Sequence, residues 1–314
     1  MSEELDKDSE RGALERLLMA HLVEQRRSRR WNIFFRSLGF LFLFTVLMLV
    51  VSFESEDFVS TGPHTALVEL QGEIGGDDGL SADALVAALD SAFEGKHTQG
   101  VVLRINSPGG SPVQSGQVYD EIKRLKGKYP NIPFYVVVDD LCASGGYYIA
   151  AAADKIFVDK ASLIGSIGVL MDGFGFTEAM EKLGVERRLL TAGEHKGFLD
   201  PFAPIDPVEE GHAKLMLNEI HQQFIQAVRQ GRGKRLKETP DMFSGLIWNG
   251  TRSIDLGLAD GLGSLDYVAR EVIKAEDILD YTPQEDLAER LARRIGSAIG
   301  EHLRPWAGGE ARLR

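Results

Sequence analysis

The sequence predicts an α/β domain that is preceded by one transmembrane helix. Three apolar segments, residues 65–72, 100–106 and 133–139, have the composition of buried β-strands. Helix-compatible segments lie between them, and strand–helix–strand units of this length imply parallel strands joined by right-handed crossovers. A long apolar stretch, residues 31–53, comes before the first strand. We therefore expect one α/β domain over residues 63–280.

Residues 31–53 have the length and composition of a membrane-spanning helix. No charged residue occurs from Leu38 to Phe53, and Arg36 lies near enough to the start to reach the headgroups. A buried core helix is rarely so apolar on every side. A cleaved signal peptide fits poorly, because about 30 residues precede the apolar run and no small-residue cleavage site follows it.

Charges on the two sides of the apolar stretch predict its orientation. Arg26, Arg27, Arg29 and Arg30 precede it, whereas acidic residues follow it directly. Positive residues stay in the cytoplasm, so residues 1–30 should be cytoplasmic, residues 54–62 a linker, and the α/β domain exported.

Overall charge excludes some partners. The chain of 314 residues has a net charge of −12, and residues 54–314 hold 27 basic and 40 acidic side chains. Without a basic block, the sequence gives no indication of nucleic-acid binding. The exported part would be repelled by an anionic membrane surface. Cys142 is the single cysteine, which excludes an intrachain disulfide and a cysteine-based zinc site.

Capping residues mark where the helices begin. Ser81 is suited to cap a helix over residues 81–95, and Ser111 to cap one over 111–127, with Pro112 in its first turn and Gln114 completing a capping box. Asp206 opens a long helix toward Arg229 by the same pattern, with Glu209 in the place of Gln114. The last segment, 281–314, predicts an amphipathic helix and a tail, with apolar side chains four residues apart at Leu287, Leu291, Ile295 and Ile299.

Two glycine-rich turns follow predicted strands. "INSPGG" (105–110) ends in Gly109 and Gly110, and "CASGG" places Ser144 ahead of Gly145 and Gly146. The carboxyl ends of parallel strands lie at one edge of a sheet, so these turns could face each other. Backbone N–H groups there could hold an oxyanion beside the Ser144 hydroxyl, as acyl transfer requires. A tight strand-to-helix turn without chemistry is the simpler interpretation of "INSPGG" alone.

A serine nucleophile needs a base, and two neighbours are candidates. His195 and Lys196 lie in "TAGEHKGFLDPF", a loop rich in Gly and Pro. Lysine can act as a base only where burial or nearby donors keep its amine uncharged. Spacing alone does not decide between the two. His21 is cytoplasmic by the predicted topology, and the remaining histidines are interpreted as surface residues: His64, His97, His212, His221 and His302.

Four motifs in this order, "INSPGG", "ASGGYYIA", "SLIGSIGV" and "HKGFLDPF", resemble the signal peptide peptidase A family. The resemblance covers roughly residues 63–275. It implies a Clp-protease/crotonase-like fold of repeated β-β-α units and a serine–lysine endopeptidase without metal or organic cofactor. Ser144 would be the nucleophile, Lys196 the general base and Ser166 the group that orients the lysine. The oxyanion donors would be Gly145 and Gly109 or Gly110.

The resemblance also implies how the protein is assembled and where it acts. The chain is similar to the short, single-domain form, which predicts a homo-oligomeric ring or dome whose active sites combine Ser144 and Lys196 of adjacent subunits. Its substrates would be remnant signal peptides and other extended apolar peptides. The catalytic domain would lie on the periplasmic or extracellular side of the cytoplasmic membrane, held by one helix.

Other interpretations of single residues remain open at this point. Cys142 could be a nucleophile, although a small buried thiol is the simpler account. Tyr147 and Tyr148 could line a substrate groove, but core packing is favoured. "CASGG" also resembles the nucleophile turn of α/β-hydrolases, with Cys142 in place of the first glycine. Three acidic residues are interpreted as turn formers: Asp139, Asp140 and Asp260.

Two other functions remain possible on the same fold. A crotonase-type acyl-thioester enzyme would use glycine N–H groups but would need neither Ser144 nor Lys196. A non-catalytic membrane scaffold would need none of these groups.

Overall fold

The computed structural model describes residues 27, 29–46, 62–76 and 81–283. The chain divides into two units, Met1–Val59 and Ser60–Arg314. In the first unit residues 29–46 form a helix whose side chains are exposed. Of the described helices, none combines the length and the apolar character needed to cross a membrane. Residues 47–53 of the predicted span, most of the predicted linker and the predicted helix in 284–314 lie outside the described residues.

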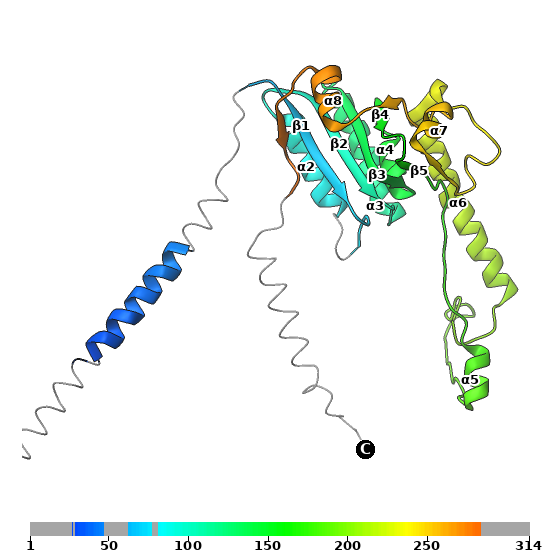
Figure 1. The fold of residues 1–314 in the computed structure, drawn as a ribbon. Coiled ribbons are helices and arrows are strands. Elements are labelled where there is room, and N and C mark those ends of the chain that lie inside the picture. Colours follow the sequence, from blue (N-terminus) through cyan, green and yellow to red (C-terminus); the bar gives the residue numbers. More distant parts are fainter. Residues whose placement is uncertain (1–26, 28, 47–61, 77–80, 284–314) are drawn as a thin grey trace, which may run out of the picture. The chain divides into compact units, whose positions relative to one another are not determined.

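The second unit is built on an eight-stranded sheet in the order β6-β5-β3-β2-β1-β8 (Figure 1). Off this path, β4 pairs with β3, and β7 pairs with β4. All pairs are parallel except β5 with β6. The predicted α/β class is therefore confirmed. The strands are β1 (His64–Gln71), β2 (Thr98–Ser107), β3 (Phe134–Ala143), β4 (Lys155–Val158), β5 (Leu163–Gly165), β6 (Ile247–Asn249), β7 (Gly261–Leu262) and β8 (Ile278–Asp280).

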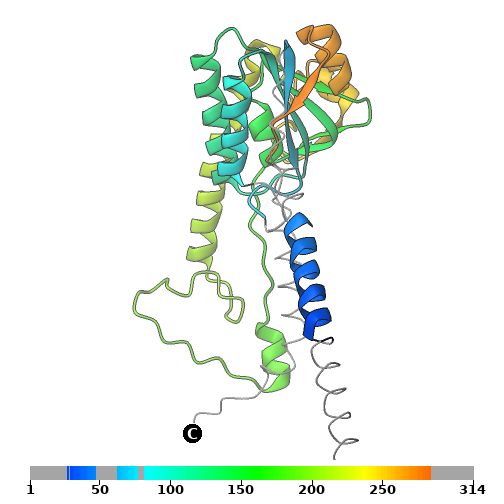
Figure 2. The same cartoon turned by 90° about the vertical axis from the view of Figure 1, so that its left-hand side faces the viewer.

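Helices cover the two faces of the sheet unequally (Figure 2). Alternate residues of a strand point to opposite faces, so Leu103 of β2 joins the main core with α2 and α3, whereas Val102 joins a small cluster with Val268. The main core lies between the sheet and α2, α3, α4 and the end of α6. The helices are α2 (Ala82–Glu94), α3 (Pro112–Lys128), α4 (Gly145–Ala150), α5 (Thr177–Leu183), α6 (Pro207–Arg232), α7 (Gly250–Asp255) and α8 (Leu265–Tyr267), which continues as a π-turn to Ile273.

Residues 168–212 form an arm that leaves the sheet after β5 and returns along α6. No residue of this range is buried. Figure 1 shows α5 at the end of the arm that is remote from the sheet. The 26 residues of α6 span about 39 Å at 1.5 Å per residue, which explains how far the arm extends.

The predicted helix starts are correct, but neither of the two predicted capping boxes forms as expected. Ser81, Ser111 and Asp206 each accept a hydrogen bond from a backbone N–H of the first turn. Gln114 does not reach back to its own cap, because its Oε1 accepts from the Ala82 N–H at 2.9 Å and so joins α3 to α2. Glu209 likewise turns to the arm, as described below.

Of the three acidic residues expected in turns, Asp139 and Asp140 lie in a strand, so that interpretation is wrong for these two. Strand β3 continues through Asp139 and Asp140 to Ala143, and Asp139 pairs with Arg104 of β2 at 2.8 Å. Asp260 accepts a hydrogen bond from the Ile156 N–H at 2.7 Å and pairs with the fully buried Arg232 at 2.9 Å. The carboxylates of Asp139 and Asp260 thus neutralise arginines of neighbouring elements.

One histidine was also misassigned. His64, expected at the surface, is 2% exposed, and its Nε2 is 3.1 Å from the Tyr281 hydroxyl. His302 lies outside the described residues.

Candidate active site

Ser144 occupies a strained turn between β3 and α4. Its backbone angles are φ 51° and ψ −123°, a conformation that costs a residue with a side chain about 1–3 kcal/mol. Hydrogen bonds on both sides hold it: the Ser144 N–H donates to Gly165 O, and its carbonyl accepts from the Tyr148 N–H, both at 2.9 Å. The turn therefore fixes the backbone position from which the Ser144 side chain projects.

The "INSPGG" turn passes close to Ser144, and only glycines fit there. A Cβ on Gly109 would lie 2.7 Å from the Ser144 Cβ, and a Cβ on Gly110 would lie 2.3 Å from Ile74 O. Both glycines have positive φ, 109° and 144°. The sequence-based expectation that the two glycine turns meet at one sheet edge agrees with this geometry.

Two backbone N–H groups beside Ser144 are available to donate hydrogen bonds to a ligand. Gly109 is already engaged, because its N–H donates to the Ser107 hydroxyl at 3.1 Å. Within the described part of the chain, neither the Gly110 N–H nor the Gly145 N–H donates a hydrogen bond. The two are close neighbours, since a Cβ on Gly145 would lie 3.3 Å from Gly110 N. Between Gly109 and Gly110, the geometry favours Gly110 as the oxyanion donor.

Ser166 lies at the same edge of the sheet. It follows β5, which pairs with β3 so that Gly165 lies opposite Ala143. Ser166 also has positive φ, 52°, and its N–H donates to Leu246 O at 2.7 Å. The pairing of two neighbouring strands thus brings Ser144 and Ser166 to one place.

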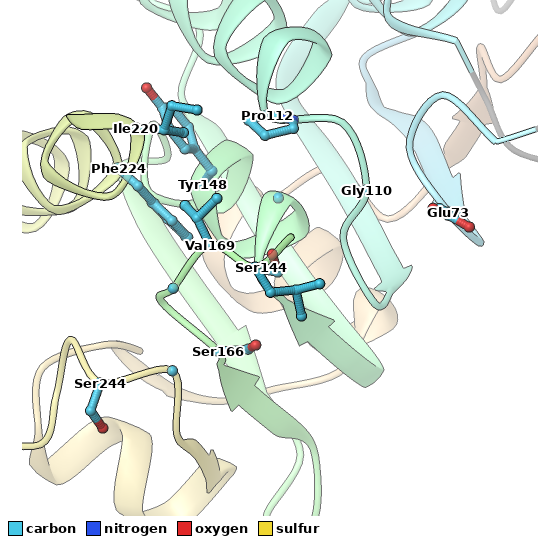
Figure 3. Close-up of a pocket in the computed structure, with 14 residues that line it drawn as sticks. Glu73, Gly110, Pro112, Ser144, Tyr148, Ser166, Val169, Ile220, Phe224 and Ser244 are labelled. Atoms are coloured by element: carbon cyan, nitrogen blue, oxygen red, sulfur yellow. The ribbon is translucent and has the colours of Figure 1, made fainter. Parts of the chain in front are cut away.

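A cavity of about 530 Å³ joins these groups. Figure 3 shows Ser144 in its centre, with Ser166 below, an apolar wall of Tyr148, Ile220 and Phe224 on one side, and Glu73 on the other. This volume is within the range of sites that bind small ligands or one or two peptide side chains. The lining residues are Glu73, Gly110, Pro112, Ser144, Gly145, Tyr148, Ser166, Gly168, Val169, Leu170, Ile220, Phe224, Ser244 and Gly245.

Lys196 is not among the residues that line this cavity. It lies on the arm, in the turns that follow α5 in the chain, and its side chain is exposed. A single copy of the chain therefore brings Ser144, Ser166 and the glycine N–H groups together but not Lys196.

His195 is engaged next to Lys196. Its Nδ1 lies 3.2 Å from Glu209 Oε1, while Glu209 Oε2 accepts from the Leu199 N–H at 3.0 Å. Leu199 has a positive φ of 51°. Glu209 of α6 thus holds both sides of the turn that carries Lys196.

Two neighbours of Ser144 have structural positions. Cys142 is completely buried, and burial raises the pKa of its thiol, which argues against a nucleophilic role. Tyr147 packs in the core and its hydroxyl donates to Leu258 O at 2.8 Å, as core packing predicts. Tyr148 is half-buried: it packs against the core and also lines the cavity.

Sequence reasoning missed Glu73. It follows β1 in a stretch with no local motif, and only the pairing of Ile74 with Gly110 brings it to the cavity. As for metals, the described residues contain no group of three or more His, Cys, Asp or Glu that could hold an ion.

Known proteins resemble this chain in the same region. Residues 126–278 match peptidase family S49. A protein of Methanocaldococcus jannaschii, whose name classes it among proteases, is 30% identical over 278 residues, 82% of this chain and 88% of that protein. An Enterococcus faecium protein named after signal peptide peptidase SppA is 29% identical over 223 residues, 71% of this chain and 64% of that protein.

The chain belongs to peptidase family S49, of the signal peptide peptidase A type. A Brucella melitensis protein named as the Na⁺/H⁺ antiporter NhaA is 46% identical over 222 residues, 70% of this chain. That match spans 30% of the antiporter-named protein, so this chain corresponds to less than a third of its length.

Proposed function

We propose that this protein is a membrane-anchored serine endopeptidase of Clp-protease/crotonase-like fold, which uses a dyad of Ser144 and Lys196. One observation carries the proposal: a strained serine with two unengaged backbone N–H groups beside it opens into a cavity of peptide side-chain size. A scaffold protein would have no need to keep Ser144 in a costly conformation. A crotonase-type thioester enzyme would need the N–H groups but not the serine.

The reaction follows from these groups. The uncharged Lys196 amine takes the proton of Ser144, whose oxygen attacks the peptide carbonyl carbon. The Gly110 and Gly145 N–H groups stabilise the negative charge that develops on the carbonyl oxygen. The lysine then gives its proton to the leaving amine, and water hydrolyses the acyl-enzyme with the lysine again acting as base. The Ser166 hydroxyl orients the amine without adding charge.

Lys196 would reach the cavity from a second copy of the chain. Within one chain it lies on the arm, outside the cavity. The arm also exposes large apolar side chains, with Leu170 80%, Phe174 78% and Leu190 96% exposed. Large apolar side chains that form an exposed patch are typical of surfaces that bind another protein. Association of several copies in a ring or dome would cover these side chains and complete each site.

Residues 31–53 would anchor the protein in the cytoplasmic membrane, with the N-terminus inside and the catalytic domain outside. The site then faces extended apolar peptides released at the membrane, such as remnant signal peptides. The apolar wall of Tyr148, Ile220 and Phe224 suits an apolar substrate side chain next to the cleaved bond.

A fluorophosphonate probe and a peptide-cleavage assay test the dyad. Ser144→Ala should abolish labelling and cleavage, and Lys196→Ala should reduce both by orders of magnitude. Mixing the two inactive chains should restore part of the activity if the site is shared, whereas Ser144→Ala mixed with itself should not. If Lys196→Ala stays active and His195→Ala is inactive, the base is His195. If Ser144→Ala cleaves peptides normally, the peptidase mechanism is refuted.

A further inference from the structure

Of the described residues that line the cavity at Ser144, one carries a charge. Glu73 is the single charged residue among the fourteen that line it, and the others are glycines, serines and apolar residues, with one tyrosine. Among the described residues Glu73 has no ion-pair or hydrogen-bond partner for its carboxylate. As far as the described residues show, an unpaired carboxylate thus lines the cavity at Ser144.

The position of Glu73 is fixed relative to the catalytic groups. Its neighbour Ile74 is fully buried and forms a parallel bridge with the glycine turn. The Ile74 N–H donates to Gly109 O at 2.8 Å, and Ile74 O accepts from the Ser111 N–H at 3.0 Å. Glu73 therefore directly precedes, in the chain, the residue that pairs with Gly110. The backbone of Glu73 is thus held beside the oxyanion turn, and its side chain reaches the cavity from there.

The cavity is also polarised. In Figure 3 Glu73 lies on one side of Ser144, whereas Tyr148 and Phe224 lie on the other. An extended peptide advances about 3.3 Å per residue, so a chain passing Ser144 presents different residues to the two sides. One side favours an apolar group and the other a cation.

We infer that Glu73 is a specificity-determining residue that binds a cationic nitrogen of the peptide substrate, within a few residues of the cleaved bond. This inference rests on the proposed peptidase function. The preferred substrate then combines an apolar side chain at the aromatic wall with a Lys or Arg side chain, or a free α-amino group, at Glu73. Such a pair lets the enzyme distinguish peptides that the apolar wall alone would bind equally well.

The experiment compares fluorogenic apolar peptides that differ at one position, Lys against norleucine. That position is moved through four residues on each side of the cleaved bond, with both peptide ends blocked. An exposed ion pair predicts a kcat/KM ratio of about 2- to 5-fold in favour of Lys at one position, weaker in 0.5 M salt. Glu73→Gln should bring the ratio to about 1, and Glu73→Lys should invert it. Glu276→Gln, which removes an exposed carboxylate outside the cavity, should keep the wild-type ratio.

A second arm separates the two possible cations. If a preference appears with a free amino terminus and not with an internal Lys, Glu73 binds the α-amino group. The same peptides are titrated onto the Ser144→Ala chain, because the Kd ratio reports recognition without turnover.

The outcomes are distinguishable. If neither an internal Lys nor a free amino terminus gives a preference that depends on Glu73, in cleavage or in binding, the inference is wrong. It is also wrong if Glu73→Gln lowers kcat/KM equally for every peptide and shifts its pH profile, since Glu73 then acts on the base. If the Kd ratio depends on Glu73 but Ser144→Ala cleaves peptides as well as wild type, recognition holds and the proposed dyad fails.

Discussion

Replacing Gly110 by alanine tests the oxyanion site directly. The new Cβ would lie 2.3 Å from Ile74 O and 2.7 Å from Ile74 N, at a φ of 144°. Contacts below 3.0 Å require backbone to move, so the turn and Ile74 must separate by more than about half an ångström. This backbone region is nearly restricted to glycine and costs other residues about 1–3 kcal/mol.

Two consequences are expected and can be measured separately. Urea unfolding should show a loss of stability of about 1–3 kcal/mol, since the strain is present in the folded state only. Displacing the Gly110 N–H removes one of two oxyanion donors, so kcat for peptide cleavage should fall by about 10²- to 10³-fold. The activity assay uses only conditions in which circular dichroism shows the variant to be folded.

Gly127→Ala is the matched control. Gly127 lies within α3, and a Cβ there would meet nothing within 4 Å. The same substitution should therefore stabilise the helix by about 0.5–1 kcal/mol and leave kcat unchanged. If folded Gly110→Ala keeps kcat within about threefold of Gly127→Ala, Gly110 is not an oxyanion donor and the reasoning fails.

Three further predictions concern groups around the site. Glu209→Ala should lower kcat by about tenfold with a smaller change in KM, because it frees the turn that carries Lys196. Glu209→Gln should restore most of the loss, and equal kcat in wild type and both variants would contradict this positioning role. Asp260→Ala should lower the free energy of unfolding in urea by about 3–5 kcal/mol, because it leaves Arg232 buried and unpaired. Arg232→Met should lower it less, since Asp260 keeps Arg235 and the Ile156 N–H as partners, and the reverse order would be evidence against a buried ion pair. Cys142 should resist iodoacetamide at pH 8 in the folded protein and react in urea, because burial raises the pKa of its thiol and leaves little thiolate; rapid labelling of the native chain would show that the thiol is accessible.

Local signals in the sequence predicted the features that depend on local physics. Ser81, Ser111 and Asp206 cap the helices that they were expected to cap, because a side chain and a backbone N–H two or three residues apart need no other element. The two glycine turns could be located for a similar reason. A strand that ends in small residues before a capped helix leaves the backbone few other conformations.

Features that depend on distant partners were not predictable from such signals. Gln114 and Glu209 both fit the capping-box pattern, yet each binds a backbone N–H of another segment, Ala82 or Leu199. Asp260 has the sequence context of a turn, but its role follows from Arg232, 28 residues away in the chain. Glu73 enters the cavity only because Ile74 pairs with Gly110, a contact that no short motif encodes.

The same distinction bears on how the proposed enzyme would be controlled. The nucleophile and the oxyanion donors depend on the sheet, where Ala143, Gly145 and Ile74 are buried and their backbone is held by hydrogen bonds. Lys196 depends on an arm with no buried residue, so its placement at Ser144 would require contacts from another copy. Since the base would arrive only on association, activity per chain should rise with protein concentration until the assembly is complete. An isolated chain would then carry a formed oxyanion site but no base, which would keep the proposed peptidase inactive until its subunits meet.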